Sequence, residues 1–499
     1  MGLNAHILTI TEPTIKVENI AAVDMGQREG GDNFDAGAGV VPYIRVNNYL
    51  FQDNEIQSFT LRLTDKYPEI SAVLVDTRDI FAVSQMPRDF DVLSLRLKGR
   101  GDKYKDIRMD FHILEFRGIP TNSAKSADGG SKYNVKAIAK LPGLYEDVCK
   151  SFGKASSYDH LIKIAEEMQL GFATNVEYTD DEMVRLCAYQ SRFDAISETV
   201  LHSYISDNTF QTYSVDPYYY LNFVDVQKLF DAEEDIEMAE LKSEINFKER
   251  AEDSSAGDEG TPVKLILTNH TNAASTANYI KSYNLTNNST QVSLENGYKR
   301  YLQYYDVNAD MSESNESLNE FFVEALVSST MKDNEEPLKG RRNSENDEYN
   351  QLVKHKYIGL QDSSTENGNV HLNWAYSAVN NIQNMAELSK MKLTVTLAAI
   401  NPAVYRYMKI PVTIYNYSTN SAYSTNLLNE KAREAGFETK NPEDENQDAK
   451  SKLPDQPVAD EFLTGYYVVM GVEYTFTEGK YNQVLHLARK EWPARINTV

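Results

Sequence analysis

The chain has 499 residues, 25% of them charged and 41% hydrophobic, and this length predicts two to four domains with room for several cores. A net charge of -24 at pH 7 argues against a surface that binds nucleic acid by releasing counterions from phosphates. Only two cysteines occur, Cys149 and Cys187, so we expect no disulfide framework and a reducing compartment. The first residues lack the pattern of a secretory signal, and no apolar run approaches the roughly 20 residues that span a bilayer.

Residues 1–122 are predicted to form a β-rich N-terminal domain of the barrel or sandwich type, because short apolar segments recur at near-regular spacing. Apolar residues alternate with others, or cluster, in the segments Tyr43–Val46, Phe59–Leu63, Ile70–Val75, Leu93–Leu97 and Met109–Ile113. The glycine-rich stretch 26–39 is predicted to be an acidic loop. A phosphate-binding loop is not expected there, because no Gly-Lys-Ser/Thr follows.

Residues 123–207 change in character and predict an α/β module. A strand is expected at Tyr133–Ala139, followed by a helix with Ser157 as its N-cap and an end at Gly171. The next four residues predict a strand, and Ser191–Ile205 has the apolar spacing of a second helix.

Two histidines on these predicted helices, His160 and His202, are the residues that invite a catalytic interpretation. Neither has a partner at a spacing typical of acid–base catalysis, so we favour a structural role for both.

Residues 208–350 are predicted to form a second β region that carries an acidic insertion. Thr209–Phe230 is expected to be a strand whose aromatic residues lie in a core or a subunit interface. Stacking on nucleic acid is disfavoured because only one basic residue, Lys228, is interleaved with them. The acidic run 231–262 is predicted to be a surface helix and loop. Four further strands are expected, at Val263–Thr268, Tyr279–Leu285, Gln291–Leu294 and 297–307.

Residues 351–499 are predicted to form a C-terminal β-barrel portion that begins with an amphipathic helix at 378–390. Period-2 patterns in Met391–Asn416 and Tyr466–Arg489 predict four strands in two hairpin-like pairs. The polar stretch 418–457 between the pairs cannot bury enough apolar surface to offset its ordering entropy, so we expect a mobile insertion.

No catalytic, cofactor-binding or metal-binding residues are predicted. The chain contains no CxxC, HExxH, Gly-x-Ser-x-Gly or Walker motif. A carboxylate pair of the glycosidase type remains open in principle, but nothing singles out a pair among 74 acidic residues.

Several segments resemble the baseplate hub proteins of contractile-tailed phages, the tail hub family that includes late control D-like proteins. The segments are FDVLSLRLKG at 90–99, YDHLIKIAEEMQLGFATN at 158–175, KLTVTLAAINPAVYRYMKIPVTIYN at 392–416 and TGYYVVMGVEYTFTEGKYNQVLHLARK at 464–490. The resemblance covers roughly residues 1–230 and 350–490.

This resemblance implies a mainly β fold with two tube-type β-barrel domains and a helix-containing α/β module. It implies a homotrimeric ring that joins a hexameric tail tube to a separate trimeric central spike and leaves a channel for DNA. Tail tube, spike and other baseplate proteins are the implied partners, together with a tape measure protein, and the implied location is the virion tail baseplate after assembly in the host cytoplasm. No enzymatic activity, specific nucleic-acid binding or membrane span is expected. A receptor- or glycan-binding β-protein of the virion periphery and a cell-wall-degrading tail enzyme are the alternatives.

Overall fold

The computed structural model describes most of the N-terminal and central chain and discrete segments of the rest. The described residues are 7–16, 40–47, 49–77, 80–81, 86–99, 106–119, 131–232, 265–267, 279–296, 299–306, 318–321, 328–331, 353–361, 368–397, 400–401, 404–416, 458–460, 462–477 and 480–492. The predicted loop 26–39 and the predicted mobile insertion 418–457 lie outside them, as does all but the first two residues of the acidic run 231–262.

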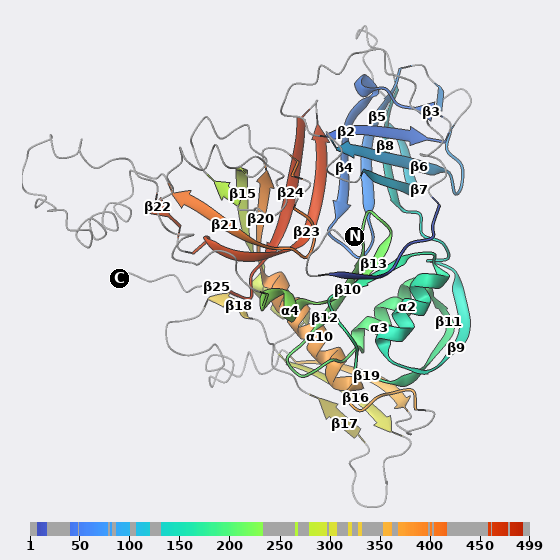
Figure 1. Ribbon diagram of the computed structural model, residues 1–499, viewed down its shortest axis with the longest axis vertical. Coiled ribbons are helices and arrows are strands. Elements are labelled where there is room, and N and C mark those ends of the chain that lie inside the picture. Colours follow the sequence, from blue (N-terminus) through green and yellow to red (C-terminus); the bar gives the residue numbers. More distant parts are fainter. Residues whose placement is uncertain are drawn as a thin grey trace, which may run out of the picture.

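The fold is mainly β with an α/β part, as predicted from the sequence, and one sheet of 14 strands dominates the described residues (Figure 1). Its hydrogen-bonded path runs β15-β20-β24-β23-β4-β5-β8-β7-β6-β2-β3, with β14, β21 and β22 attached beside it. The path is open, so the described strands of the N-terminal and C-terminal halves form one continuous sheet and do not close into two separate barrels. One hydrophobic core follows this sheet through both halves.

The N-terminal half of the sheet consists of antiparallel strands close to the predicted positions. They are β2 (Val40–Val46), β3 (Tyr49–Leu50), β4 (Ile56–Leu63), β5 (Glu69–Asp76), β6 (Val92–Gly99), β7 (Ile107–Ile119) and β8 (Ser131–Ala139). A short 3-10 turn, η1 (Asp53–Glu55), precedes β4. Alternate residues of β4 and β5 are buried, which is the one-sided burial that their period-2 pattern predicts.

The α/β module packs a four-stranded sheet and a two-stranded ribbon around two helices. The sheet has the order β1-β10-β13-β12, with β1 (Leu8–Thr11), β10 (Gly171–Thr174), β12 (Gln211–Val215) and β13 (Tyr220–Asp225). The ribbon pairs β9 (Asp147–Ala155) with β11 (Met183–Ser191), and the helices are α2 (Ser157–Glu167) and α3 (Arg192–Leu201). In Figure 1 the helices and the ribbon lie below the N-terminal strands.

Both ends of α2 differ from the prediction by a few residues. The N-cap is Ser156 and not Ser157, because the Ser156 hydroxyl accepts the Asp159 amide at 3.2 Å. The left-handed residue after the helix is Gln169, with φ of 59°, and the Leu170 amide donates to Ala165 at 2.8 Å. Gly171 therefore serves a different purpose: a Cβ there would lie 2.8 Å from the Thr11 carbonyl oxygen, so glycine allows β1 to approach β10.

Two predicted strands in the central region are wrong. Thr209–Phe230 is not one strand but the β12–β13 hairpin followed by helix α4 (Val226–Phe230), because the Asp216 carboxylate accepts the amides of Tyr218 and Tyr220 and closes a turn. Gln291–Leu294 lies in helix α7 (Ser289–Asn296). The Gln291 and Glu295 side chains pair at 2.9 Å, a helical i, i+4 contact.

In the C-terminal half, one of the two predicted hairpins forms. β23 (Gly465–Thr477) pairs with β24 (Lys480–Ala488), but β20 (Met391–Leu397) does not pair with β21 (Lys409–Asn416). β20 lies between β15 (Ile280–Asn287) and β24, whereas β21 joins the far side of β23. The connection crosses the hairpin because Gln483 of β24 holds it, accepting the Asn401 amide and donating to the Val404 carbonyl.

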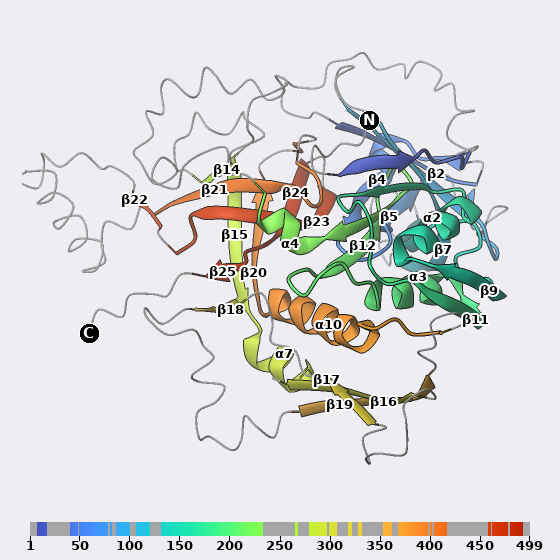
Figure 2. The same cartoon turned by 60° about the horizontal axis from the view of Figure 1, so that its bottom comes forward.

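The remaining elements complete this half. They are β14 (Leu265–Leu267), β16 (Lys299–Asp306), β17 (Leu318–Phe321), β18 (Ser328–Met331), β19 (Val353–Gln361), α10 (Trp374–Lys390), β22 (Val458–Ala459) and β25 (Glu491–Trp492). Figure 2 shows α10 running beneath the large sheet, with α7 and the small sheet of β16, β17 and β19 beyond it. Within the described segments, every helix is too short or too polar to cross a bilayer.

Candidate functional site

His160, the first histidine that the sequence raises as a catalytic candidate, lies on α2 in a fully buried polar cluster. Its Nδ1 accepts a hydrogen bond from Arg185 Nε at 3.1 Å, so its Nε2 is the protonated nitrogen and donates to the Gly153 carbonyl at 3.2 Å. Burial, with the adjacent Arg185 guanidinium second, lowers the pKa of His160 to about 4. These contacts commit both ring nitrogens to holding the β9–β11 ribbon on α2, which is a structural role.

His202 caps the C-terminal end of α3 and is clasped by the start of α10. Its Nδ1 donates to the Trp374 carbonyl at 3.0 Å, and its ring stacks on the indole of Trp374 at 3.9 Å between centroids. In return, His371 Nε2 donates to the His202 carbonyl at 2.8 Å while its Nδ1 accepts the Asn373 amide. Burial lowers the pKa of His371. The fold brings two histidines together here, but both are buried and bind backbone groups.

Amide side chains, together with apolar contacts, hold helix α10 against the α/β module. Asn381 is buried and accepts the Gln211 amide at 2.9 Å. Its Nδ2 lies 3.2, 3.0 and 3.4 Å from the carbonyls of Val200, Leu201 and Ser203. One side chain thus satisfies the C-terminal carbonyls of α3 and fixes the start of β12.

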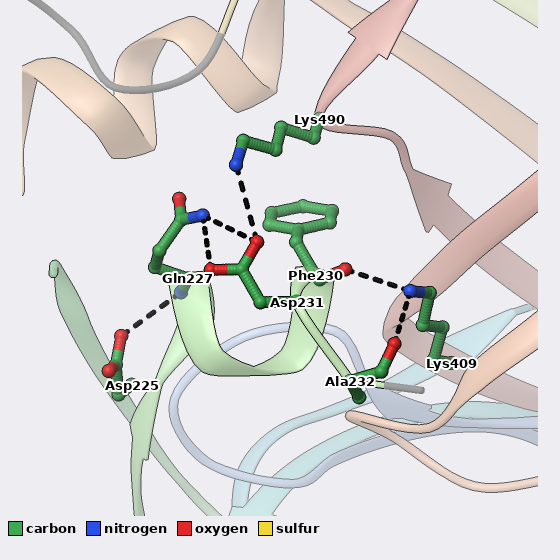
Figure 3. Close-up of polar contacts among 7 residues, drawn as sticks. All are labelled: Asp225, Gln227, Phe230, Asp231, Ala232, Lys409 and Lys490. Atoms are coloured by element: carbon green, nitrogen blue, oxygen red, sulfur yellow. Dashed lines mark hydrogen bonds and ion pairs between the residues drawn. The ribbon is translucent and has the colours of Figure 1, made fainter. Parts of the chain in front are cut away.

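Helix α4 occupies a junction between the α/β module and the C-terminal strands (Figure 3). Its N-cap, Asp225, accepts the Gln227 amide at 3.0 Å. At its other end, Lys409 of β21 donates to the carbonyls of Phe230 and Ala232 at 2.8 and 2.7 Å. Lys490 and Gln227 both reach the Asp231 carboxylate. The two lysines therefore fix the start of the acidic run 231–262 at the end of helix α4.

The pKa of the Asp225 carboxyl group is raised to about 6. Burial is the main cause and outweighs the backbone amides that stabilise the charged form. A buried carboxyl with a raised pKa is a common sign of acid–base function. Here, however, the carboxyl caps a helix at 3.0 Å and the neighbouring amide of Asn175 binds only its backbone, so the geometry supports a structural role.

The place where the two halves of the sheet meet has an unusual strand arrangement. One edge of β23 pairs with β21 over Gly465–Val468 and then with β4 over Val472–Thr477, while β24 pairs along the other edge from Val468 to Thr477. A register shift between Val469 and Gly471 separates the two pairings. We call this place, formed by Thr64, Asp65, Arg406, Tyr407 and Gly471, the strand crossing.

One close backbone approach and three hydrogen bonds hold the strand crossing. A Cβ on Gly471 would lie 3.0 Å from the Thr64 Cα. Arg406 donates to the Thr64 carbonyl at 3.1 Å and also to the Asp65 carbonyl. Tyr407 is buried with φ of 69°, and its amide donates to the Val469 carbonyl at 2.6 Å.

The pockets and the clusters of potential metal ligands give no stronger candidate for a functional site. A shallow, open hollow of about 510 Å³ lies at α7 and is lined by Asn287, Asn288, Thr290, Gln291, Leu294 and Glu295. Among the described residues, no three His, Cys, Asp or Glu side chains lie together in a way that could hold a metal ion. The notable polar contacts of the described residues therefore lie at three junctions: α10 with the α/β module, α4 with the C-terminal strands, and the strand crossing.

Sequence reasoning missed the residues of these junctions. Gly471 had a readable signal, since a glycine inside an alternating strand often marks a bulge or a close backbone approach. Arg406, Lys409 and Asn381 had none, because their partners lie far away in the sequence.

Comparison with known proteins gave no matching family model and no matching curated sequence. Solved structures do match. A tail protein from Neisseria meningitidis has a TM-score of 0.46 and 8% identity, over 90% of this chain and 97% of that one. A 43 kDa prophage tail protein from Shewanella oneidensis has a TM-score of 0.46 and 6% identity, over 90% and 98%. An E. coli type VI secretion system component, described as similar to T4 bacteriophage tail proteins, has a TM-score of 0.39 and 8% identity, over 91% and 79%.

Proposed function

We propose that this chain is the structural hub of a phage tail baseplate. In this role three copies form a ring that joins the hexameric tail tube to the trimeric central spike and leaves a channel for DNA. The observation that carries the proposal is the continuous sheet: β23 joins the N-terminal and C-terminal halves, and β15 and β3 are the end strands of its path. A rigid sheet with two end strands suits assembly by contacts between copies, which also covers edges that would otherwise aggregate.

Most of the sequence segments that resemble hub proteins fall on strands of this continuous sheet, and one falls on the α/β module. Residues 158–175 form α2 and β10, residues 392–416 contain β20 and β21, and residues 464–490 contain β23 and β24. We propose the same partners as the resemblance implies: tail tube, central spike, other baseplate proteins and a tape measure protein. The proposed location is the virion tail, with assembly in the host cytoplasm, and the proposed role is not catalytic.

We propose the domain division predicted from the sequence, with one feature added. The divisions are 1–122, 123–207, 208–350 and 351–499, and the feature is that strands of the first and last divisions pair directly. Phe59 of β4 lies opposite Phe476 of β23, and the two rings stack at 5.8 Å. The two outer divisions therefore behave as one structural unit in the proposed ring.

The test is the mass and shape of the purified full chain, measured by light scattering after size exclusion and by electron microscopy. The proposal expects a mass three times that of one chain, or a ring of three copies once tube or spike protein is added. A compact monomer that stays monomeric with both partners would contradict it. Binding to glycans, or turnover of peptidoglycan that a single carboxylate substitution abolishes, would favour the two alternative functions.

The channel of the proposed ring should have an acidic inner face. With a net charge of -24, the chain can line a bore that repels phosphate, and repulsion lets DNA pass where attraction would stall it. Screening over roughly 10 Å confines this effect to acids at the wall. An electron microscopy map of the ring in which lysine and arginine line the channel would contradict this part of the proposal.

A further inference from the structure

The strand crossing has features that a simple connection between two sheets does not need. β23 is 13 residues long and changes partner once along a single edge, from β21 to β4. β24 pairs with the opposite edge of β23 across the position where the partner changes. The angle between β21 and β4 is therefore set at that position of β23. Bulges bend a strand and increase its twist, so the register shift at Val469–Gly471 is the point where this angle originates.

Gly471 lets the backbones at the crossing come into contact. β4 ends at Leu63, opposite Val472, and the next residue, Thr64, lies against Gly471. A Cβ there would meet the Cα and Cγ2 of Thr64 at 3.0 Å, closer than side chains normally approach. Since a backbone atom is one of the two, the backbone at Thr64 would have to move by a few tenths of an ångström to admit a larger residue.

Arg406 and Tyr407, which precede β21, also bind the backbone at the strand crossing. The Arg406 guanidinium binds the Thr64 and Asp65 carbonyls just past the end of β4 and lies 4.9 Å from the Tyr407 ring. Tyr407 adopts a left-handed backbone, which a tyrosine rarely does without support from its surroundings. A simple connection between β21 and β4 would need neither the Arg406 hydrogen bonds nor the left-handed backbone of Tyr407. A requirement for one fixed angle between the two strands explains both.

We propose that the strand crossing is the positioning site that fixes the angle between the two sheet halves, and that Gly471 and Arg406 thereby determine whether copies of the chain can close into a ring. This inference rests on the proposed hub function, because a closed ring accepts only one angle between neighbouring contact surfaces. Gly471 and Arg406 act through geometry and need not touch the neighbouring copy.

The experiment compares Gly471→Val with Gly153→Val in the full chain. Valine is favoured in strands, so neither change opposes strand formation itself. Gly153 lies in β9, also a strand, and no heavy atom would lie within 4 Å of a Cβ there, which makes it the matched control. Gly471→Ala and Arg406→Met provide milder disturbances of the same crossing.

Two measurements are made on each variant: ring formation by light scattering, and amide hydrogen exchange by mass spectrometry. We expect Gly471→Val to weaken ring formation by at least about ten-fold and to raise exchange at the β4–β23 pairing, while exchange in β5 and β8 stays protected. Gly153→Val should match the wild type in both. Gly471→Ala and Arg406→Met should fall between, which keeps the test informative if the valine variant is unfolded.

The outcomes separate the inference from the proposed function. If the wild type forms rings and the Gly471 and Arg406 variants form them equally well, the inference is overturned. If the wild type forms no ring with tube or spike protein, the hub proposal fails. In that case altered exchange confined to the β4–β23 pairing would still support the strand crossing as the place that sets the angle, and exchange equal to that of Gly153→Val would refute it.

Discussion

Replacing Asn381 with alanine should cost more stability than its small size suggests. The change removes the acceptor of the buried Gln211 amide and the donor to the Val200 and Leu201 carbonyls. A buried polar group left without a partner costs about 1–3 kcal/mol. The Val200 carbonyl keeps the Ser203 hydroxyl as a donor at 2.7 Å, so the groups that lose a partner are the Gln211 amide and the Leu201 carbonyl. Together they give an expected loss of about 3 kcal/mol, near the upper range for single substitutions.

The Gln211 amide reports this loss directly, because its hydrogen exchange depends on opening of the α10 contact. A loss of about 3 kcal/mol corresponds to roughly a hundred-fold faster exchange at this amide. Asn380→Ala is the matched control, one residue away on the same helix, because the Asn380 side chain binds the Thr209 carbonyl at 2.6 Å and the Asn384 side chain at 2.7 Å but not the Gln211 amide. Equal effects of the two variants, or a change of less than three-fold for Asn381→Ala, would refute the reasoning.

Three further predictions concern other buried groups. Asp225→Asn should gain stability relative to the wild type as pH rises from 4 to 7. The raised pKa, about 6 against an ordinary 3.8, means that ionising Asp225 costs the folded state up to about 3 kcal/mol, and a gap independent of pH in thermal unfolding would contradict this. His160 has the opposite sign: its pKa of about 4 makes the fold lose stability as pH falls below 6.5, and His160→Gln should flatten that acid limb in the same unfolding series. Lys409→Ala should cost about 1–2 kcal/mol in urea unfolding because two carbonyls at the end of α4 lose their donor. Lys490→Ala, which removes a half-exposed ion pair to Asp231, should cost less than about 1 kcal/mol. A larger loss for Lys490→Ala than for Lys409→Ala would contradict the conclusion that Lys409 is the more important of the two lysines.

Strands with strict alternation were predictable because one face is buried. Phe59, Leu61 and Leu63 are buried in β4 as their spacing requires. The failures came from local chemistry that competes with this pattern. Asp216 closes a turn through its carboxylate, which divided an apparently continuous aromatic strand into a hairpin. In α7, a short apolar alternation fitted helix as well as strand.

Most junction residues, Gly471 excepted, could not be predicted for a different reason. A histidine on a predicted helix can be judged structural from its missing partners, and the contacts of His160 agree with that interpretation. A residue such as Arg406 gains its role only when residues 64 and 65 lie beside it in the fold. Periodicity and spacing describe neighbours along the chain, and they contain no information about such distant contacts.

The pairing of β4 with β23 has a consequence for how the protein is made. Phe59 and Phe476 are roughly 400 residues apart, and closing a flexible loop of that length costs about 5 kcal/mol before any contact repays it. During synthesis, β4 leaves the ribosome long before its partner exists, so one edge of the N-terminal sheet stays uncovered until the chain has almost been completed. Folding of this half is therefore expected to finish late and slowly, and a chain cut short before residue 465 should aggregate through the exposed edge of β4.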